Sequence, residues 1–155
     1  MFQRVTLIGN VGQEPQMRYT PDGTPVASFS LATRTVVSKA RNPECPNGWK
    51  ESFNGKSWEV TTWWRVTCWR QLAETVSQYV TKGQQLFIEG EMAGEAQDGK
   101  INPRVWTGKD GMARASFEIT ARTLKFIGSR GEATAAAPVG EAPPEGFEEE
   151  SDLPF

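Results

Sequence analysis

The sequence contains no histidine and only two cysteines. Without histidine, the chain has no imidazole general base, no histidine-activated nucleophile and no Cys/His zinc site. Cys45 and Cys68 are too few for a disulfide framework and are typical of a reducing, cytoplasmic setting. Because no pair of carboxylates falls in a recognisable catalytic motif either, the sequence predicts no catalytic residue, no metal and no cofactor, and a protein that is not an enzyme.

Long apolar runs are missing as well. No segment approaches the ~20 apolar residues that a membrane-spanning helix requires. Residues 1–5 lead directly into strand-like sequence, without the apolar region of a signal peptide. We therefore expect a cytoplasmic protein with no membrane partner.

One segment imitates a phosphate-binding loop. Residues 94–100 place two glycines and a lysine at the spacing of that loop. However, Ile101 stands where a metal-binding hydroxyl is needed, and no helical pattern follows. A glycine-containing hairpin turn explains this segment better.

Basic residues are absent from residue 131 onward. Residues 1–130 contain all 17 basic residues and 12 acidic ones, a net charge of +5, whereas residues 131–155 contain 7 acidic residues and no basic one. A basic body joined to an acidic arm suggests a domain that binds a polyanion and a separate tip that binds a partner. A purely solubilising tail is the alternative, but solubility alone does not require the apolar residues of the tip, Asp152, Leu153, Pro154 and Phe155.

The acidic arm is expected to be disordered. Residues 131–150 are dominated by Ala, Glu, Pro and Gly, and cannot bury enough apolar surface to offset the entropy lost on ordering. We therefore divide the chain into a folded domain at residues 1–128, a disordered linker at 129–150 and an acidic partner-binding tip at 151–155.

Apolar and polar residues alternate as in β-strands in five segments, at residues 4–12, 26–33, 58–69, 86–92 and 116–127. Residues 70–80 instead repeat their apolar side chains at helical spacing. The order of three strands, one helix and two strands predicts an all-β fold. We expect a five-stranded Greek-key OB-fold barrel with one helix between strands 3 and 4, followed by the disordered acidic C-terminal tail.

The third of these strands has two different faces. One face is mainly apolar and contains Trp58 and Trp64, which is typical of a core or of a subunit contact. The opposite face places Arg65 between Trp63 and Trp69. A buried face would not normally hold an arginine, and a solvent-exposed face would not normally carry two tryptophans.

Exposed aromatic rings among cations are the groups that single-stranded nucleic acid requires. Bases stack on flat side chains, at about 1–3 kcal/mol per base, while cations follow the phosphates. Since stacking tolerates any base, the pattern predicts weak sequence preference. The candidate stacking residues are Trp63, Trp69, Trp106, Phe87 and Trp49, and the candidate phosphate-binding residues are Arg4, Arg34, Arg65, Arg70, Lys82 and Arg104.

Taken together, these segments resemble the bacterial-type single-stranded DNA-binding protein family. The resemblance implies an OB-fold homotetramer, cytoplasmic and nucleoid-associated, that coats single-stranded DNA during replication, recombination and repair. It also implies that proteins of these processes bind the tip, and that base-stacking aromatics occupy Trp63, Trp69 and Trp106. The matching stretches are residues 5–12 with Pro15 and Arg18, 23–33, 62–66, 71–79, 82–83, 87–90, the closing strand to Gly128, and the terminal Asp-Leu-Pro-Phe, which is similar to the family's Asp-Ile-Pro-Phe.

The chain departs from the family pattern in several places. Trp64 stands where the family commonly has a histidine near the subunit interface. A family tryptophan near the end of the second strand is replaced around Val36 or Val37. Residues 41–57 and 94–105 form longer insertions than the family usually shows.

Two other interpretations remain open. The barrel could be an RNA-binding OB-fold module, or an oligomeric protein-interaction scaffold that uses the tryptophans as contacts. An RNA-binding module is expected to exploit the 2′-hydroxyl. A scaffold is expected to show little salt-sensitive binding of single strands.

Overall fold

The computed structural model of the chain describes residues 2–108 and 111–127. The expected linker and tip, and with them Asp152, Leu153, Pro154 and Phe155, lie outside these residues. Within them the elements follow in the order β1 (Val5–Val11), β2 (Gln16–Tyr19), β3 (Pro25–Ser38), β4 (Lys50–Glu51), β5 (Ser57–Trp69), α1 (Gln71–Tyr79), β6 (Gln85–Ala93), β7 (Glu95–Gln97), β8 (Lys100–Asn102), β9 (Arg104–Thr107) and β10 (Ala113–Phe126).

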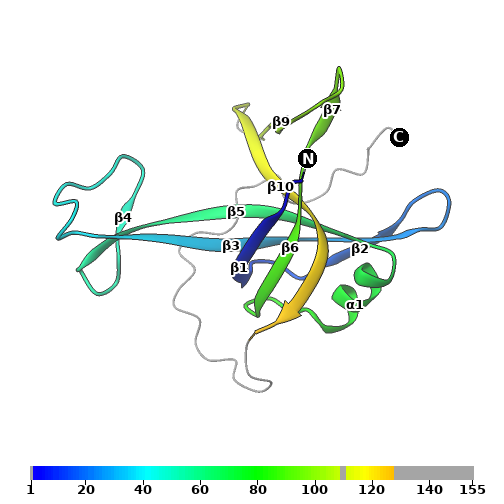
Figure 1. Cartoon of the computed structure of the whole chain (residues 1–155), viewed down its shortest axis with the longest axis horizontal. Coiled ribbons are helices and arrows are strands. Elements are labelled where there is room, and N and C mark those ends of the chain that lie inside the picture. The colour runs from blue at the N-terminus through cyan, green and yellow to red at the C-terminus, as the bar shows by residue number, and fades with distance from the viewer. Residues whose placement is uncertain (1, 109–110, 128–155) are drawn as a thin grey trace.

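Five strands close into a barrel (Figure 1). They pair in the order β3–β1–β6–β10–β5, and β5 pairs back onto β3. All neighbours in this ring are antiparallel except β10 and β5, which are parallel. Along the chain, α1 separates the third barrel strand, β5, from the fourth, β6. This architecture confirms the predicted OB-fold barrel with one helix between strands 3 and 4.

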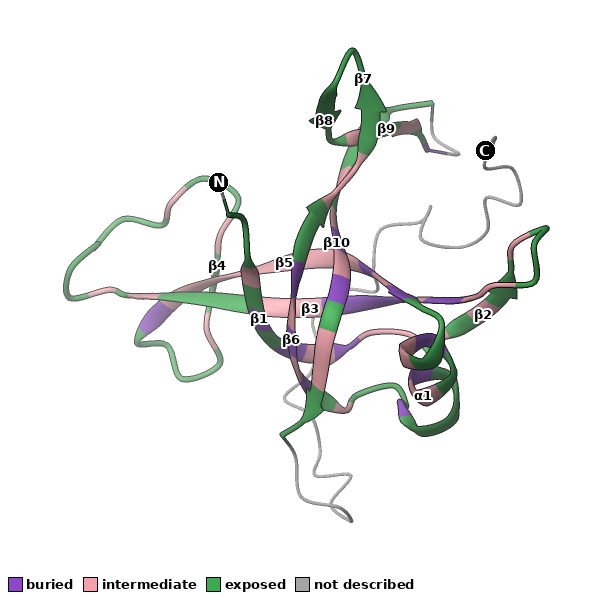
Figure 2. Cartoon of the chain, turned by 45° about the vertical axis from the view of Figure 1, so that its right-hand side comes forward, coloured by how far each residue is buried: buried purple, intermediate pink, exposed green. Residues whose placement is uncertain are grey.

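The core fills the inside of the barrel because each strand turns alternate side chains inward. Leu31, Val66, Leu86, Ile88 and Ile119 have no exposed surface. Figure 2 shows the buried stretches where the barrel strands cross one another. Each such side chain contributes about 1.5–3 kcal/mol relative to leaving it exposed.

The helix α1 adds to this core from one side. Ala73 and Val76, three residues apart and therefore on the same helix face, are both fully buried. The helix occupies residues 71–79, one residue shorter at each end than the predicted 70–80. Among the described residues, no helix combines the length and the apolar character needed to cross a bilayer.

The strands β3 and β5 continue beyond the barrel as a two-stranded ribbon (Figure 1). Their pairing runs from Val26 opposite Trp69 to Ser38 opposite Ser57, and β4 joins β5 near the far end. The second barrel strand is therefore longer than the predicted residues 26–33. The ribbon has no core to face, so the apolar alternation that marks a barrel strand is lost there.

The hairpin of β7 and β8 turns at Asp98 and Gly99, whose φ angles are 50° and 72°. Positive φ at both central residues, in an Asp-Gly pair, is typical of a type I′ turn. The structure thus confirms that residues 94–100 form a hairpin turn and not a phosphate-binding loop.

Candidate nucleic-acid interface

The outer face of β5 carries two of the predicted stacking residues. The pairing of β5 with β3 sets Ala32 beside Trp63 and Val26 beside Trp69, with Arg65 between the two tryptophans. Cross-strand partners share one face of a sheet. The intervening side chains of β5 point into the core, so these three side chains lie on the outside of the barrel.

The strands β10 and β9 extend this face. Their register sets Glu118 beside Arg65 and Arg114 beside Trp106. Every second side chain of β10 shares a face, so Trp106 lies on the same side of the barrel as Arg65. We call this surface the tryptophan face and define it by Trp63, Arg65, Trp69, Arg104 and Trp106.

The indoles of the tryptophan face are exposed to different degrees. Trp69 is 44% exposed, whereas Trp63 and Trp106 are half-buried. Trp106 is held in place because its Nε1–H donates to Ser116 Oγ at 2.9 Å, and the Arg114 guanidinium lies 5.5 Å from the ring centroid. None of the three rings is sealed in the core, so each leaves ring surface that a base can stack on.

The tryptophans of the opposite β5 face make packing contacts instead. Trp64 Nε1 donates to Thr33 Oγ1 at 3.0 Å, and its ring centroid lies 5.5 Å from that of Phe117. Trp58 Nε1 donates to the carbonyl oxygen of Asn42 at 2.8 Å. The alternation along β5 therefore places Trp58 and Trp64 on one face of the strand and Trp63 and Trp69 on the other.

Two predicted stacking residues lie away from the tryptophan face. Phe87 is on the outer wall of β6, opposite Ile8 of β1 and Lys125 of β10. Trp49 directly precedes β4, which lies on the ribbon outside the barrel (Figure 1). The structure does not bring either residue together with the three clustered indoles.

Three of the predicted phosphate-binding residues make ion pairs with carboxylates. A carboxylate beside a guanidinium lowers the positive potential that the guanidinium offers to a phosphate. The pairs are Arg4 with Glu89, Arg34 with Glu59 at 3.3 Å, and Arg104 with Glu118 at 3.6 Å.

Arg70 and Lys82 differ from these residues. Within residues 2–108 and 111–127, neither side chain makes an ion pair or a hydrogen bond. Both are exposed. Among the described residues, no carboxylate therefore forms an ion pair with either of these two cations.

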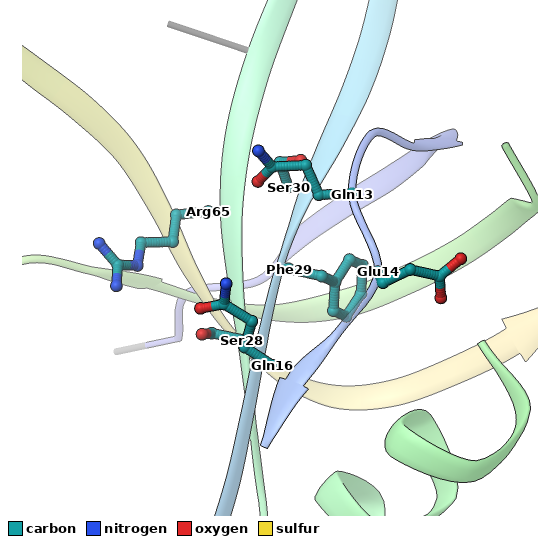
Figure 3. A pocket seen from close by; sticks show the side chains of 7 residues that line it. All are labelled: Gln13, Glu14, Gln16, Ser28, Phe29, Ser30 and Arg65. Atoms are coloured by element: carbon teal, nitrogen blue, oxygen red, sulfur yellow. The ribbon is translucent and has the colours of Figure 1, made fainter. Parts of the chain in front are cut away.

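A small recess opens beside Arg65 on the tryptophan face (Figure 3). Its volume of about 10 Å³ accommodates one water molecule but no base. The recess is therefore too small for a base to enter. The recess is lined by Gln13, Glu14, Gln16, Ser28, Phe29, Ser30 and Arg65.

Arg70 has an unusual backbone between Trp69 and α1. Its φ of 53° and ψ of −130° are those of the first central residue of a type II′ turn, a position that favours glycine. Its N–H donates to the Pro25 carbonyl oxygen at 2.8 Å, and its own carbonyl oxygen accepts from the Ala73 N–H at 2.9 Å. Holding a residue with a Cβ in such a conformation costs about 1–3 kcal/mol.

Sequence reasoning missed the polar partners of the tryptophan face. Ser116 holds Trp106, and Glu118 pairs with Arg104. The sequence pattern predicts a closing strand from residue 116, whereas β10 begins at Ala113 and so includes Arg114. The polar alternation of Arg114, Ser116 and Glu118 was the available signal.

Comparisons with known proteins show which family the chain matches. The model of a family described as the single-strand binding protein family matches residues 2–127. A protein named single-stranded DNA-binding protein from Neisseria meningitidis serogroup A is 35% identical over 140 residues, which cover 90% of this chain and 68% of that protein. Single-stranded DNA-binding protein 1 of Xylella fastidiosa is 33% identical over 129 residues, which cover 83% of this chain and 79% of that protein.

A solved structure is also similar. The crystal structure of the small single-stranded DNA-binding protein from Streptomyces coelicolor matches with a TM-score of 0.58 at 20% identity, over 82% of this chain and 96% of that chain. At this identity the likeness concerns the fold alone. The family match, by contrast, spans every barrel strand and the whole tryptophan face. The chain therefore belongs to the single-strand binding protein family.

Proposed function

We propose that the tryptophan face binds single-stranded DNA, with bases stacked on Trp63, Trp69 and Trp106 and phosphates bound by neighbouring cations. The observation that supports this proposal most is the strand register, which aligns the three indoles on one continuous outer face with Arg65 among them. The family is one of DNA-binding proteins without enzymatic activity, which fits a surface that binds and does not catalyse.

Stacking supplies the part of the affinity that does not depend on salt. Each stacked base contributes about 1–3 kcal/mol, and every base has a π-face, so we expect little sequence preference. Arg65, Arg70 and Lys82 supply the salt-dependent part, because bound phosphates release counterions when they meet cations.

A strand longer than the tryptophan face reaches the remaining candidates. Along the ribbon these are Arg34 and Trp49, and on the wall formed by β1 and β6 they are Arg4 and Phe87. Arg104 lies within the face itself. The three arginines that are ion-paired must each break that pair before they bind a phosphate. We therefore expect each of them to contribute less to the binding free energy than Arg70 or Lys82.

A fluorescence titration with oligo(dT) at two salt concentrations tests the proposal. The double variant Trp63→Ala/Trp69→Ala is expected to weaken binding by about 30-fold or more, because two stacked bases are lost. Trp64→Phe, on the opposite face of β5, is the matched control and is expected to bind like the wild type. Wild-type affinity in the double variant would remove the tryptophan face from the binding path, and no binding by the wild type at low salt would contradict single-strand binding itself.

Further parts of the proposal rest on the sequence. We place the recruitment of replication, recombination and repair proteins in the tip formed by Asp152, Leu153, Pro154 and Phe155, and the protein at the nucleoid in the cytoplasm as a homotetramer. Deleting residues 152–155 is expected to leave oligo(dT) affinity unchanged and to abolish the pull-down of such proteins. An unchanged pull-down would reduce the tail to a solubilising segment.

A further inference from the structure

A hollow with a volume of about 880 Å³ opens at the end of the tryptophan face where β5 leads into α1. Its walls come from the turn between β2 and β3, from the junction that contains Trp69 and Arg70, and from β10 at residues 120–122. Pockets of about 300–1,000 Å³ hold compact organic ligands. Unlike the recess beside Arg65, this hollow can therefore admit a base together with its sugar.

The hollow is also lined by the carboxylate of Asp22, which is held by hydrogen bonds within its own turn. The Asp22 carboxylate accepts hydrogen bonds from the hydroxyls of Thr20 and Thr24, which hold the pKa of Asp22 below its usual value. These bonds stay within the turn between β2 and β3. Asp22 thus stays ionised and orders its own turn.

The two cations of the hollow differ in their partners. Arg122 makes an ion pair with Glu91, with Nη2 3.2 Å from the carboxylate. Arg70 makes no ion pair and no side-chain hydrogen bond within the described part of the chain. A phosphate that enters the hollow therefore meets Arg70 as an unpaired guanidinium, next to the exposed ring of Trp69.

The backbone at Arg70 gives a second and independent observation. Its φ of 53° and ψ of −130° favour glycine, so glycine would stabilise the fold at this position. Strained residues of this kind cluster at ligand sites, where the strain is retained for function. Arginine, the residue present, gives up that stability and supplies a long cation at the edge of the hollow.

We propose that the hollow is a subsite for one nucleotide of the bound strand, in which Trp69 stacks the base and Arg70 binds the adjacent phosphate. Arg70 is retained there although it destabilises the fold. This inference rests on the proposed binding of single-stranded DNA and deepens it, since it assigns one nucleotide to a hollow while its neighbours lie on the open face.

Three substitutions at Arg70 separate charge from backbone strain. Arg70→Gln keeps the strain and removes the charge, and is expected to weaken oligo(dT) binding by about tenfold, the effect of one charge-assisted hydrogen bond. It is also expected to reduce the slope of log K against log salt by about 0.7, the signature of one phosphate that is no longer neutralised. Arg70→Gly is expected to show the same losses together with a higher melting temperature, whereas Arg70→Lys is expected to recover most of the binding.

Asp98→Gly is the matched control. In the described part of the chain, Asp98 is the other residue with a side chain that has a positive φ, and it lies in the turn between β7 and β8. Its replacement is expected to leave oligo(dT) affinity and the salt slope unchanged. Unchanged affinity and slope in both Arg70→Gln and Arg70→Gly would overturn the subsite. A lower melting temperature for Arg70→Gly would contradict the inference that Arg70 destabilises the fold. A wild-type protein that does not bind oligo(dT) would instead contradict the proposed function.

Discussion

Trp63 lies against Gly12, which directly follows β1. A Cβ added to Gly12 would clash with Cζ3 of the Trp63 ring, and would stand 3.0 Å from Cη2 of that ring and 2.7 Å from Ser30 Oγ. These separations are well inside van der Waals contact. The missing side chain at Gly12 therefore sets where the indole rests on the barrel wall, and with it the surface that the ring offers to a base.

Replacing Gly12 with alanine is expected to displace the Trp63 ring. Because the new methyl group overpacks the site, the free energy of unfolding should fall by about 1–3 kcal/mol. Oligo(dT) affinity should fall by up to about tenfold, the value of one impaired stack. Denaturant unfolding gives the first quantity and tryptophan fluorescence titration the second.

A double-mutant cycle shows whether Gly12 acts through Trp63. If it does, Gly12→Ala is expected to have little further effect on affinity in a Trp63→Ala background, since the ring that it displaces is gone. Fully additive losses would mean that Gly12 contributes to binding by another route.

The hydrogen bond between Trp106 and Ser116 leads to a second prediction. Ser116→Ala removes the acceptor of the indole N–H, which lies at 2.9 Å, and is expected to cost about 0.5–1.5 kcal/mol of stability. The freed ring should lose orientation, so oligo(dT) binding should weaken several-fold. Ser77→Ala, on the exposed side of α1, is the matched control, and equal effects of the two variants on affinity would contradict a role for the hydrogen bond.

The barrel could be predicted because alternation reports directly which side of a strand is buried. Leu86 and Ile88 face the core and Phe87 does not, as the sequence pattern requires. The same alternation along one strand predicts Trp63 and Trp69 on one face. The side of a strand that each residue faces was therefore predictable from one strand at a time, whereas the ends of β3 and β10 were not.

The pattern along one strand does not predict which side chains of different strands come to lie on the same face. That Trp106 joins the face of Trp63 depends on the register of β9 with β10 and of β10 with β5, which tertiary packing sets. Residue type alone groups Phe87 and Trp49 with them, although the fold separates them. The hollow beside Arg70 has walls from three distant segments, and no local pattern encodes such a site.

Burial of Cys68 gives a prediction for the alkaline range. The side chain has no exposed surface, and its burial raises the pKa of the thiol from 9.0 to about 12. Above pH 9 the unfolded chain loses this proton while the folded chain keeps it, so the unfolded state binds fewer protons and stability falls as the pH rises. The loss is expected to reach about 1.4 kcal/mol per pH unit between these two values.

Denaturant unfolding between pH 8 and pH 11 measures this loss, with Cys68→Ala as the comparison. The variant is less stable at pH 8 because it leaves a small cavity, but its stability should fall less steeply with pH. Parallel curves for the two proteins would show that other groups cause the alkaline loss.

Glu118 brings a carboxylate into the tryptophan face. Its Oε1 lies 3.6 Å from Arg104 Nε, and its side chain is only 11% exposed. The register also sets it beside Arg65. Because an anion near these guanidiniums opposes the arrival of a phosphate, Glu118 should weaken the binding of a polyanion.

Glu118→Gln keeps the shape of the side chain and removes its charge. We expect oligo(dT) affinity to rise several-fold and the salt slope to steepen by about 0.7 for each additional phosphate that the protein neutralises. Glu44→Gln, in an exposed loop of the ribbon, changes the net charge equally and is the matched control. An equal rise in both variants would trace the effect to overall charge. A loss of affinity in Glu118→Gln would mean that the carboxylate instead holds the arginines in the orientation that the strand requires.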